Sequence, residues 1–156
     1  TALPKDGEAA IESATLYVAS QPMAMLKMGD SIEIELGIVG MRSQGHYVAG
    51  LAFYDKMGGR ICGLNSFETA NVSFPLAAGV CTRTVCRIQN MNLLPGLYRV
   101  DAILQTATDR RPVDKVENML RFEVAGWDVY RTGRIPKGPG VLYWPCQWEF
   151  IPEPKG

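Results

Sequence analysis

The chain has 156 residues, of which 47% are hydrophobic and 21% are charged. This composition excludes an intrinsically disordered chain, and the length allows one domain with a sizeable core. The 16 basic and 16 acidic residues balance, so the chain lacks the excess of Lys and Arg with which duplex-binding proteins displace counterions, and nucleic acid is not an expected partner.

Short runs of alternating apolar and polar residues, separated by Gly and Pro, recur along the whole chain. This pattern predicts an all-β fold, an immunoglobulin-like antiparallel β-sandwich of two sheets. We expect one such domain over residues 1–156, with residues 1–13 as an N-terminal linker or arm. No apolar run approaches the length of a membrane-spanning helix. The first residue is Thr rather than Met, which favours a fragment or a processed product.

The first predicted strand covers residues 15–19, and the second, over residues 31–39, has the clearest alternation. Aliphatic side chains occupy one face of this second strand and Glu33 and Glu35 occupy the other, because side chains alternate across a strand. A strand over residues 46–54 follows, then a turn and a strand over residues 60–66. The inward side chains of strand 46–54 are Tyr47, Ala49, Leu51 and Phe53.

Three further strands are predicted over residues 80–89, 96–105 and 116–124. Arg83 and Arg87 lie on the outward face of the first of these. A helix competes with a strand only around residues 112–120. The buried side chains of strand 96–105 are expected to be Tyr98, Val100, Ala102 and Leu104.

Residues 126–150 are predicted to form a flexible connector, rich in Gly and Pro, and a last strand over residues 141–150. An apolar face of this strand has to be buried, either in the sandwich or against a second subunit. We expect a homodimer that forms through this C-terminal strand, with strand exchange as one route. The apolar face consists of Leu142, Trp144, Cys146, Trp148 and Phe150.

Glu33 and Glu35 are two residues apart on one strand face, a spacing that would suit the paired carboxylates of a glycosidase. A structural interpretation is favoured, because the neighbouring strand is expected to present Arg83 and Arg87 for cross-strand ion pairs. The chain also has no G-x-x-x-x-G-K-[ST] loop for nucleotide phosphates. No catalytic residue is therefore predicted.

The four cysteines form no C-x-x-C pair, and they are scattered over several predicted strands together with the only histidine. We therefore predict neither a metal site nor a cofactor, and we interpret the cysteines as reduced thiols of a cytosolic protein. A disulfide or metal-binding set is the alternative. The cysteines are Cys62, Cys81, Cys86 and Cys146.

The outward face of strand 46–54 has small residues at its centre and rings at both ends, which indicates a shallow depression. Strand 96–105 is its usual neighbour in this fold class, and its outward side chains offer donors and acceptors for sugar hydroxyls. Arg99 can also pair with a carboxylate or phosphate. The predicted carbohydrate-binding residues are His46, Tyr54, Arg99, Asp101 and Gln105. An ordinary solvated face with an Arg99–Asp101 pair is the alternative.

Several motifs follow one another in a characteristic order. Gly29-Asp30 precedes the second strand, a D-x-x-G turn begins at Asp55, and N-L-L-P-G-L-Y covers residues 92–98. Asp114, Asn118 and Phe122 come next, then a glycine-containing tail that reaches Trp148. Over about residues 29–148 this succession resembles the C-terminal domain of the ATPase subunit (Wzt) of O-antigen polysaccharide ABC transporters.

The resemblance implies a non-catalytic module that recognises O-antigen polysaccharide, at its capped non-reducing end, before export. It further implies an ATPase domain in the full-length chain, a transmembrane permease subunit as partner, two copies per transporter, and a cytoplasmic location at the inner membrane. Two alternatives remain open. One is a structural or dimerisation sandwich without a glycan ligand, and the other is a glycan-trimming hydrolase that uses Glu33 and Glu35.

Overall fold

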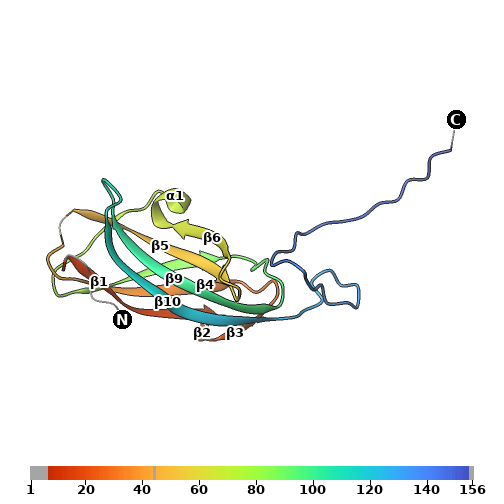
Figure 1. Ribbon diagram of the computed structural model, residues 1–156, viewed down its shortest axis with the longest axis horizontal. Helices are drawn as coiled ribbons and strands as arrows, with labels where there is room; N and C mark the ends of the chain where they lie inside the picture. The colour runs from red at the N-terminus through yellow and green to blue at the C-terminus, as the bar shows by residue number, and fades with distance from the viewer. Residues whose placement is uncertain (1–6, 44, 155–156) are drawn as a thin grey trace.

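The structure is a computed structural model that describes residues 7–43 and 45–154 (Figure 1). Strands form two sheets that pack face to face, and the C-terminal segment leaves one end of this sandwich. The first sheet has the strand order β2-β1-β4-β8 and the second has the order β3-β10-β9-β5-β6, with β7 paired to β5. All pairs are antiparallel except β10 with β3. The predicted all-β sandwich is confirmed.

The bounds of the elements follow the predicted strands closely in the middle of the chain. The first sheet consists of β1 (Ala9–Val18), β2 (Gln21–Pro22), β4 (Ile32–Gly40) and β8 (Cys81–Ile88). The second sheet consists of β3 (Met25–Lys27), β5 (His46–Asp55), β6 (Arg60–Asn65), β7 (Phe74–Pro75), β9 (Gly96–Thr106) and β10 (Pro112–Ala125). A short helix, α1, covers Ser66–Ala70.

The core lies between the two sheets and is built from the inward faces that the alternation predicts. The four inward side chains of β5 and the four of β9 are all buried. Phe122 of β10 packs against both strands, stacked on Tyr98 and edge-on to Phe53. Because buried aromatic and aliphatic groups dominate folding stability, this layer fixes the second sheet as a rigid platform. Its opposite face is then free to carry polar side chains.

The structure differs from the prediction at the start of the chain and at the start of β10. Strand β1 begins at Ala9, so residues 9–13 belong to the sandwich rather than to an arm, and Ala9 and Ile11 are fully buried. Residues 1–6 lie outside the described residues. Strand β10 also covers residues 112–120, where a helix competed in the sequence, because its backbone pairs with β9 and Val113 is buried in the core.

Helix α1 and the short strands β2, β3 and β7 were not predicted. Asn65 begins the helix, because its side chain accepts a hydrogen bond of 2.8 Å from the backbone N–H of Glu68. Asn71 ends it in the left-handed conformation. The helix has only five residues, and no helix within residues 7–43 and 45–154 is long and apolar enough to cross a bilayer.

The predicted last strand is wrong for this structure. Residues 141–143 contact the sandwich through a bridge between Leu93 and Leu142 and a hydrogen bond from Leu94 N–H to the Val141 carbonyl. Beyond residue 143 the chain runs away from the sheets (Figure 1) and pairs with no described strand. Alternation alone does not make a strand, since a strand needs a neighbour for its backbone groups. The apolar side chains of this segment are therefore exposed rather than buried in the core: Trp144 by 71%, Trp148 by 82% and Phe150 by 85%.

Candidate functional site

The outward face of the second sheet carries a row of cationic and aromatic side chains near one end of the sandwich. In the register of the sheet, Tyr54 pairs with Arg60 on one side and with Arg99 on the other, and Arg99 pairs with Arg121. Four neighbouring strands, β6, β5, β9 and β10, thus contribute one residue each. We call these four residues the arginine row.

Arg99 is held in place by two contacts. Its Nη1 donates a hydrogen bond of 2.8 Å to Oδ1 of Asp101, and its guanidinium carbon lies 4.0 Å from the centroid of the Tyr54 ring. A guanidinium group has five N–H donors, so most of those on Arg99 stay available to a ligand. The side chain is 31% exposed. Arg99 is therefore an oriented donor on a surface that solvent can reach.

Asp101 is a nearly buried acceptor that orients the Arg99 side chain. Its side chain is only 4% exposed, and its Oδ1 accepts a second hydrogen bond of 2.9 Å from the backbone N–H of Asn118. Asn118 lies where the pairing of β10 with β9 shifts register, between Val116 and Leu120, and it has a positive φ of 53°. The irregularity in β10 thus brings a backbone donor to Asp101.

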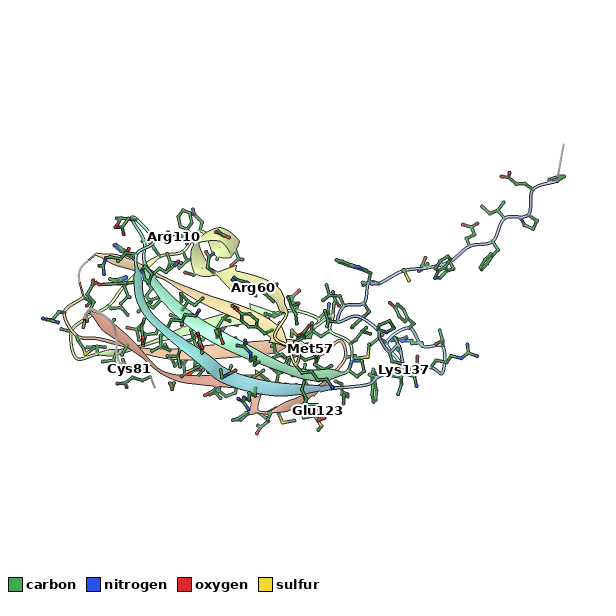
Figure 2. The ribbon with its side chains drawn as sticks, in the orientation of Figure 1. Met57, Arg60, Cys81, Arg110, Glu123 and Lys137 are labelled. Carbon is green, nitrogen blue, oxygen red and sulfur yellow. The ribbon has the colours of Figure 1, made fainter. Side chains whose placement is uncertain are left out.

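A cavity of about 620 Å³ opens beside Arg99. The turn after β5 forms one wall, where the Asp55 carboxylate accepts hydrogen bonds of 2.9 Å from the N–H groups of Met57 and Gly59. Figure 2 shows Met57 and Glu123 at the same end of the sandwich. Because the turn is tied to its own aspartate, the wall is preformed. The lining residues include Asp55, Met57, Leu97, Arg99, Arg121 and Glu123.

Arg60 extends the positive charge toward the edge of the sheet. Its guanidinium lies over Gly63, where a Cβ atom would collide with Nη2 of the arginine. Three guanidinium groups therefore occupy one face, with the ring of Tyr54 between two of them. Guanidinium forks bind carboxylate and phosphate oxygens in pairs and also donate to hydroxyl oxygens. This end of the face suits a polar ligand with hydroxyl or acidic groups.

The structure brings together three of the five predicted site residues: Tyr54, Arg99 and Asp101. Gln105 is six residues from Arg99 on the same strand, a separation of about 20 Å. His46 begins β5 at the far end and pairs with Pro75. The expected open depression between them is filled, because Val48 is only 1% exposed despite its outward position. Helix α1 lies beside β5 here, and its Ser66 Oγ accepts a hydrogen bond from Ala49 N–H.

Arg60 and Arg121 were missed as site residues. Arg121 lies in a clear alternating run and its outward direction is predictable, but the register shift in β10 hides its pairing with Arg99. Arg60 lies just after the predicted turn, and only the close approach to Gly63 places its head group on the face. The alternating positions flanking the predicted residues are the signal that could have found them.

The other candidate clusters have structural partners. Arg87 pairs with Glu33 at 2.9 Å and Arg83 pairs with Glu35 at 3.6 Å, which confirms the predicted cross-strand ion pairs. The four cysteines have free thiols. Within the part of the chain that the structure describes, no three His, Cys, Asp or Glu side chains gather as a metal site would require.

Known structures share this architecture. The crystal structure of the C-terminal domain of wzt matches with a TM-score of 0.79 at 16% identity, covering 93% of this chain and 85% of that one. A Bacteroides uniformis β-glucuronidase matches with a TM-score of 0.52 at 12% identity, over 70% of this chain and 14% of the enzyme. A calcium-binding mutant of B. uniformis β-glucuronidase 2 gives 0.51 at 13% identity, over 74% and 13%. At these identities the matches show the fold.

The sequence itself gives a family assignment. No curated protein sequence matches the chain. The family model of the Wzt C-terminal domain, however, matches residues 3–135, which covers both sheets and the whole arginine row. The chain therefore belongs to the Wzt C-terminal domain family.

Proposed function

We propose that this chain is a non-catalytic carbohydrate-binding module that recognises O-antigen polysaccharide for export by an ABC transporter. Membership of the Wzt C-terminal domain family supports the transport context. The observation that carries the binding role is the Arg99–Asp101–Tyr54 cluster beside an open cavity. It offers oriented donors on a rigid sheet, which is what recognition of hydroxyl groups requires.

The cavity favours the end of a glycan chain. The turn after β5 closes one side, so a terminal sugar, with its cap, would sit against Met57 while the chain continues along the sheet. Arg121, which lines the cavity, would pair with a carboxylate or phosphate on that end group. Each hydroxyl contact replaces one with water and adds only about 0.5–1.5 kcal/mol, so a single site binds weakly.

We further propose that the module works in pairs. Two copies, each joined to an ATPase domain that contacts a membrane permease at the cytoplasmic face of the inner membrane, would compensate for weak binding through effective concentration. The exposed segment after Tyr143 would supply the dimer contact. Its large apolar side chains are unusual for the surface of a monomer.

The module has no catalytic role in this proposal. The Glu33 and Glu35 carboxylates are engaged by Arg87 and Arg83 on the outward face of the first sheet, away from the arginine row. A second candidate function is a dimerisation sandwich without a glycan ligand. The exposed Trp144, Trp148 and Phe150 favour it, since they indicate an assembly surface independent of any sugar.

An array of purified O-polysaccharides tests the proposal. The unmodified protein should bind one polysaccharide or a small related group, and Arg99→Ala should lose most of that signal. Binding should also fall when the non-reducing end of the bound polysaccharide is removed. A protein that binds no polysaccharide at high micromolar concentration, yet forms a dimer, would instead support the structural alternative.

A further inference from the structure

A second cavity, of about 520 Å³, lies at the end of the sandwich from which the C-terminal segment departs. Three segments form it: the turn between β3 and β4, the loop after β8, and the chain that follows β10. We call it the end cleft. Its lining residues include Lys27, Asn90, Asn92, Trp127, Arg131 and Tyr143.

Backbone hydrogen bonds between these segments hold the walls of the end cleft. Gly29 N–H donates to the Met91 carbonyl at 3.0 Å, and Met91 N–H donates to the Asp30 backbone carbonyl at 2.8 Å. Tyr143 N–H donates to the Asn92 carbonyl at 3.1 Å and attaches the C-terminal segment to the same loop. Because the walls are tied in this way, a ligand entering the cleft needs little ordering of the protein.

The chain after β10 is also fixed internally. The Asp128 carboxylate accepts hydrogen bonds from Thr132 N–H at 2.9 Å and Gly133 N–H at 2.8 Å, which closes a tight turn. Gly126 packs so closely that a Cβ atom there would collide with the side chain of Ile135. The position of Trp127, between these two points, is therefore set by the fold.

Trp127 presents an aromatic surface to the end cleft. Its side chain is 52% exposed, and the Nζ atom of Lys27 lies 4.1 Å from the ring centroid. Tyr130 and Tyr143 pack edge to face in the same cleft, with centroids 6.1 Å apart. An exposed indole beside hydrogen-bonding side chains matches a pyranose ring, which has an apolar C–H face and polar hydroxyl edges.

Polar groups around the cleft are left for a ligand. The side chains of Asn90, Asn92 and Arg131 form no hydrogen bond or ion pair with any of the described residues. An amide side chain has both donors and an acceptor, so it can bind neighbouring hydroxyls of one sugar. Two such amides and the Arg131 guanidinium line the cleft together with the Trp127 indole.

The end cleft continues the face that carries the arginine row. Arg121, Glu123 and Ala125 are alternate residues of β10 and share the outward face. Lys27 pairs with Ala125, and its ammonium group lies over Trp127, so the indole stands on this same face. The separation between Arg121 and Trp127 is about 20 Å along the strand.

From this arrangement we propose that the end cleft is a second sugar subsite, which binds an internal pyranose residue of the polysaccharide whose end occupies the cavity beside Arg99. This inference rests on the proposed function. It makes recognition depend on chain length, because a short fragment would fill only the cavity beside Arg99. The interaction at Trp127 requires no charge on the sugar.

Calorimetry with two probes tests the subsite: the O-polysaccharide selected by the array, and a short fragment that retains its non-reducing end. The unmodified protein should bind the polysaccharide more tightly than the fragment. Trp127→Ala should weaken polysaccharide binding about tenfold, to the level of the fragment, and leave fragment binding unchanged. Trp127→Phe should retain most of the affinity, and Asn92→Ala should lose part of it. Met23→Ala, an exposed apolar residue outside both cavities, is the matched control.

Nuclear magnetic resonance gives an independent readout. The indole N–H signal of Trp127, assigned by its absence in Trp127→Phe, should shift with the polysaccharide and not with the fragment. Equal affinity for the two probes, or a Trp127→Ala variant that binds the polysaccharide normally, overturns the subsite and leaves the proposed function standing. Equal weakening of both probes also overturns it, since Trp127 would then act through the fold. If no polysaccharide binds the unmodified protein, both proposals fail.

Discussion

Arg99 donates a hydrogen bond of 2.8 Å to Asp101, which lies two residues further along the same strand and points to the same face. Such a pair would be ordinary on a solvated sheet, but here the acceptor is almost completely buried and also accepts the N–H of Asn118. The carboxylate therefore serves as an anchor that orients the guanidinium. Substitutions of Arg99 and of Asp101 should therefore affect binding and stability to different extents.

Arg99→Ala should abolish most glycan binding at a moderate cost in stability. The side chain stands on the outward face, so its removal opens no cavity in the core, but it leaves the nearly buried Asp101 carboxylate without its ion-pair partner. We expect a lower melting temperature with the fold retained, and an affinity at least tenfold lower by calorimetry. Arg83→Ala, an exposed arginine of the other sheet, is the control and should bind normally. Unchanged affinity of Arg99→Ala would exclude this face as the binding site.

Asp101→Ala should weaken binding and also destabilise the protein. It leaves the Asn118 N–H without its acceptor, which costs about 1–3 kcal/mol when the group is shielded from water. Asp101→Asn keeps an acceptor oxygen and should recover most of the stability. Urea unfolding of both variants measures the difference. Equal stability of Asp101→Ala and the unmodified protein would show that Asp101 is not an anchor.

Glu33→Gln should have little effect on either stability or binding. Its ion pair with Arg87 joins two exposed side chains, and such pairs contribute about 0–1 kcal/mol. Thermal unfolding and the glycan array check the two parts of this expectation. Loss of a polysaccharide-cleaving activity in this variant would contradict the non-catalytic role and revive the hydrolase alternative.

The alternation of residues predicted the fold because both faces of the long strands obey it. The inward side chains of β5 and β9 are buried, and the ion pairs between β4 and β8 were expected from the Arg and Glu positions alone. Neighbouring strands could be inferred because the fold class fixes their usual order. The same reasoning predicted that Tyr54, Arg99 and Asp101 lie close together on one outward face, as they do.

The remaining features depend on departures from this alternation. The irregularity in β10 around Asn118 changes the register, and no propensity rule sets its position, so Arg121 could not be placed opposite Arg99. Helix α1 has only five residues and depends on its Asn65 cap, yet it lies beside β5, where Val48 is buried. The residues after Tyr143 alternate like a strand, but the sequence cannot say whether a neighbouring strand exists.

Stability should fall at alkaline pH through the half-buried thiol of Cys86. Burial raises the pKa of this thiol, and the nearby Cys62 raises it further. Because the thiol pKa is higher in the folded state, the protonated thiol makes its full contribution to folding stability below the unfolded-state pKa of about 8.5. This contribution is lost as the pH rises through the folded-state pKa. Urea unfolding between pH 8 and pH 11 should show a component of the decline that Cys86→Ala removes.

The same thiols should differ in reactivity toward iodoacetamide. The thiolate is the reactive form, so the raised pKa of Cys86 slows its alkylation. Cys146 is exposed in the C-terminal segment and should react first. Mass spectrometry of a time course at pH 8 gives the order. Protein alkylated at lysis should carry four labels, and a native disulfide would contradict the expected cytosolic location.

Removal of the residues after Tyr143 should convert a dimer into a monomer. Leu142 and Tyr143 contact the sandwich, so a chain that ends at Tyr143 keeps these contacts and should still fold. What it loses is Trp144, Trp148, Phe150 and Ile151, four large apolar side chains that are all exposed in the single chain. The segment after Tyr143 alternates like a strand but pairs with no described strand. Pairing with the same segment of a second copy would give its backbone groups hydrogen-bond partners and would bury its apolar side chains.

Light scattering at concentrations well above micromolar measures the result. The intact chain should have twice the mass of the monomer, and the chain ending at Tyr143 should have the monomer mass with a similar melting temperature. Trp148→Ser with Phe150→Ser is a gentler variant that should weaken the dimer without shortening the chain. Because paired copies bind a glycan array with avidity, both variants should lose array signal. The double-serine variant keeps every residue of the end cleft, so its one-site affinity in calorimetry should stay the same. An intact chain that is monomeric would refute this assembly and would leave the exposed tryptophans as a surface for another protein.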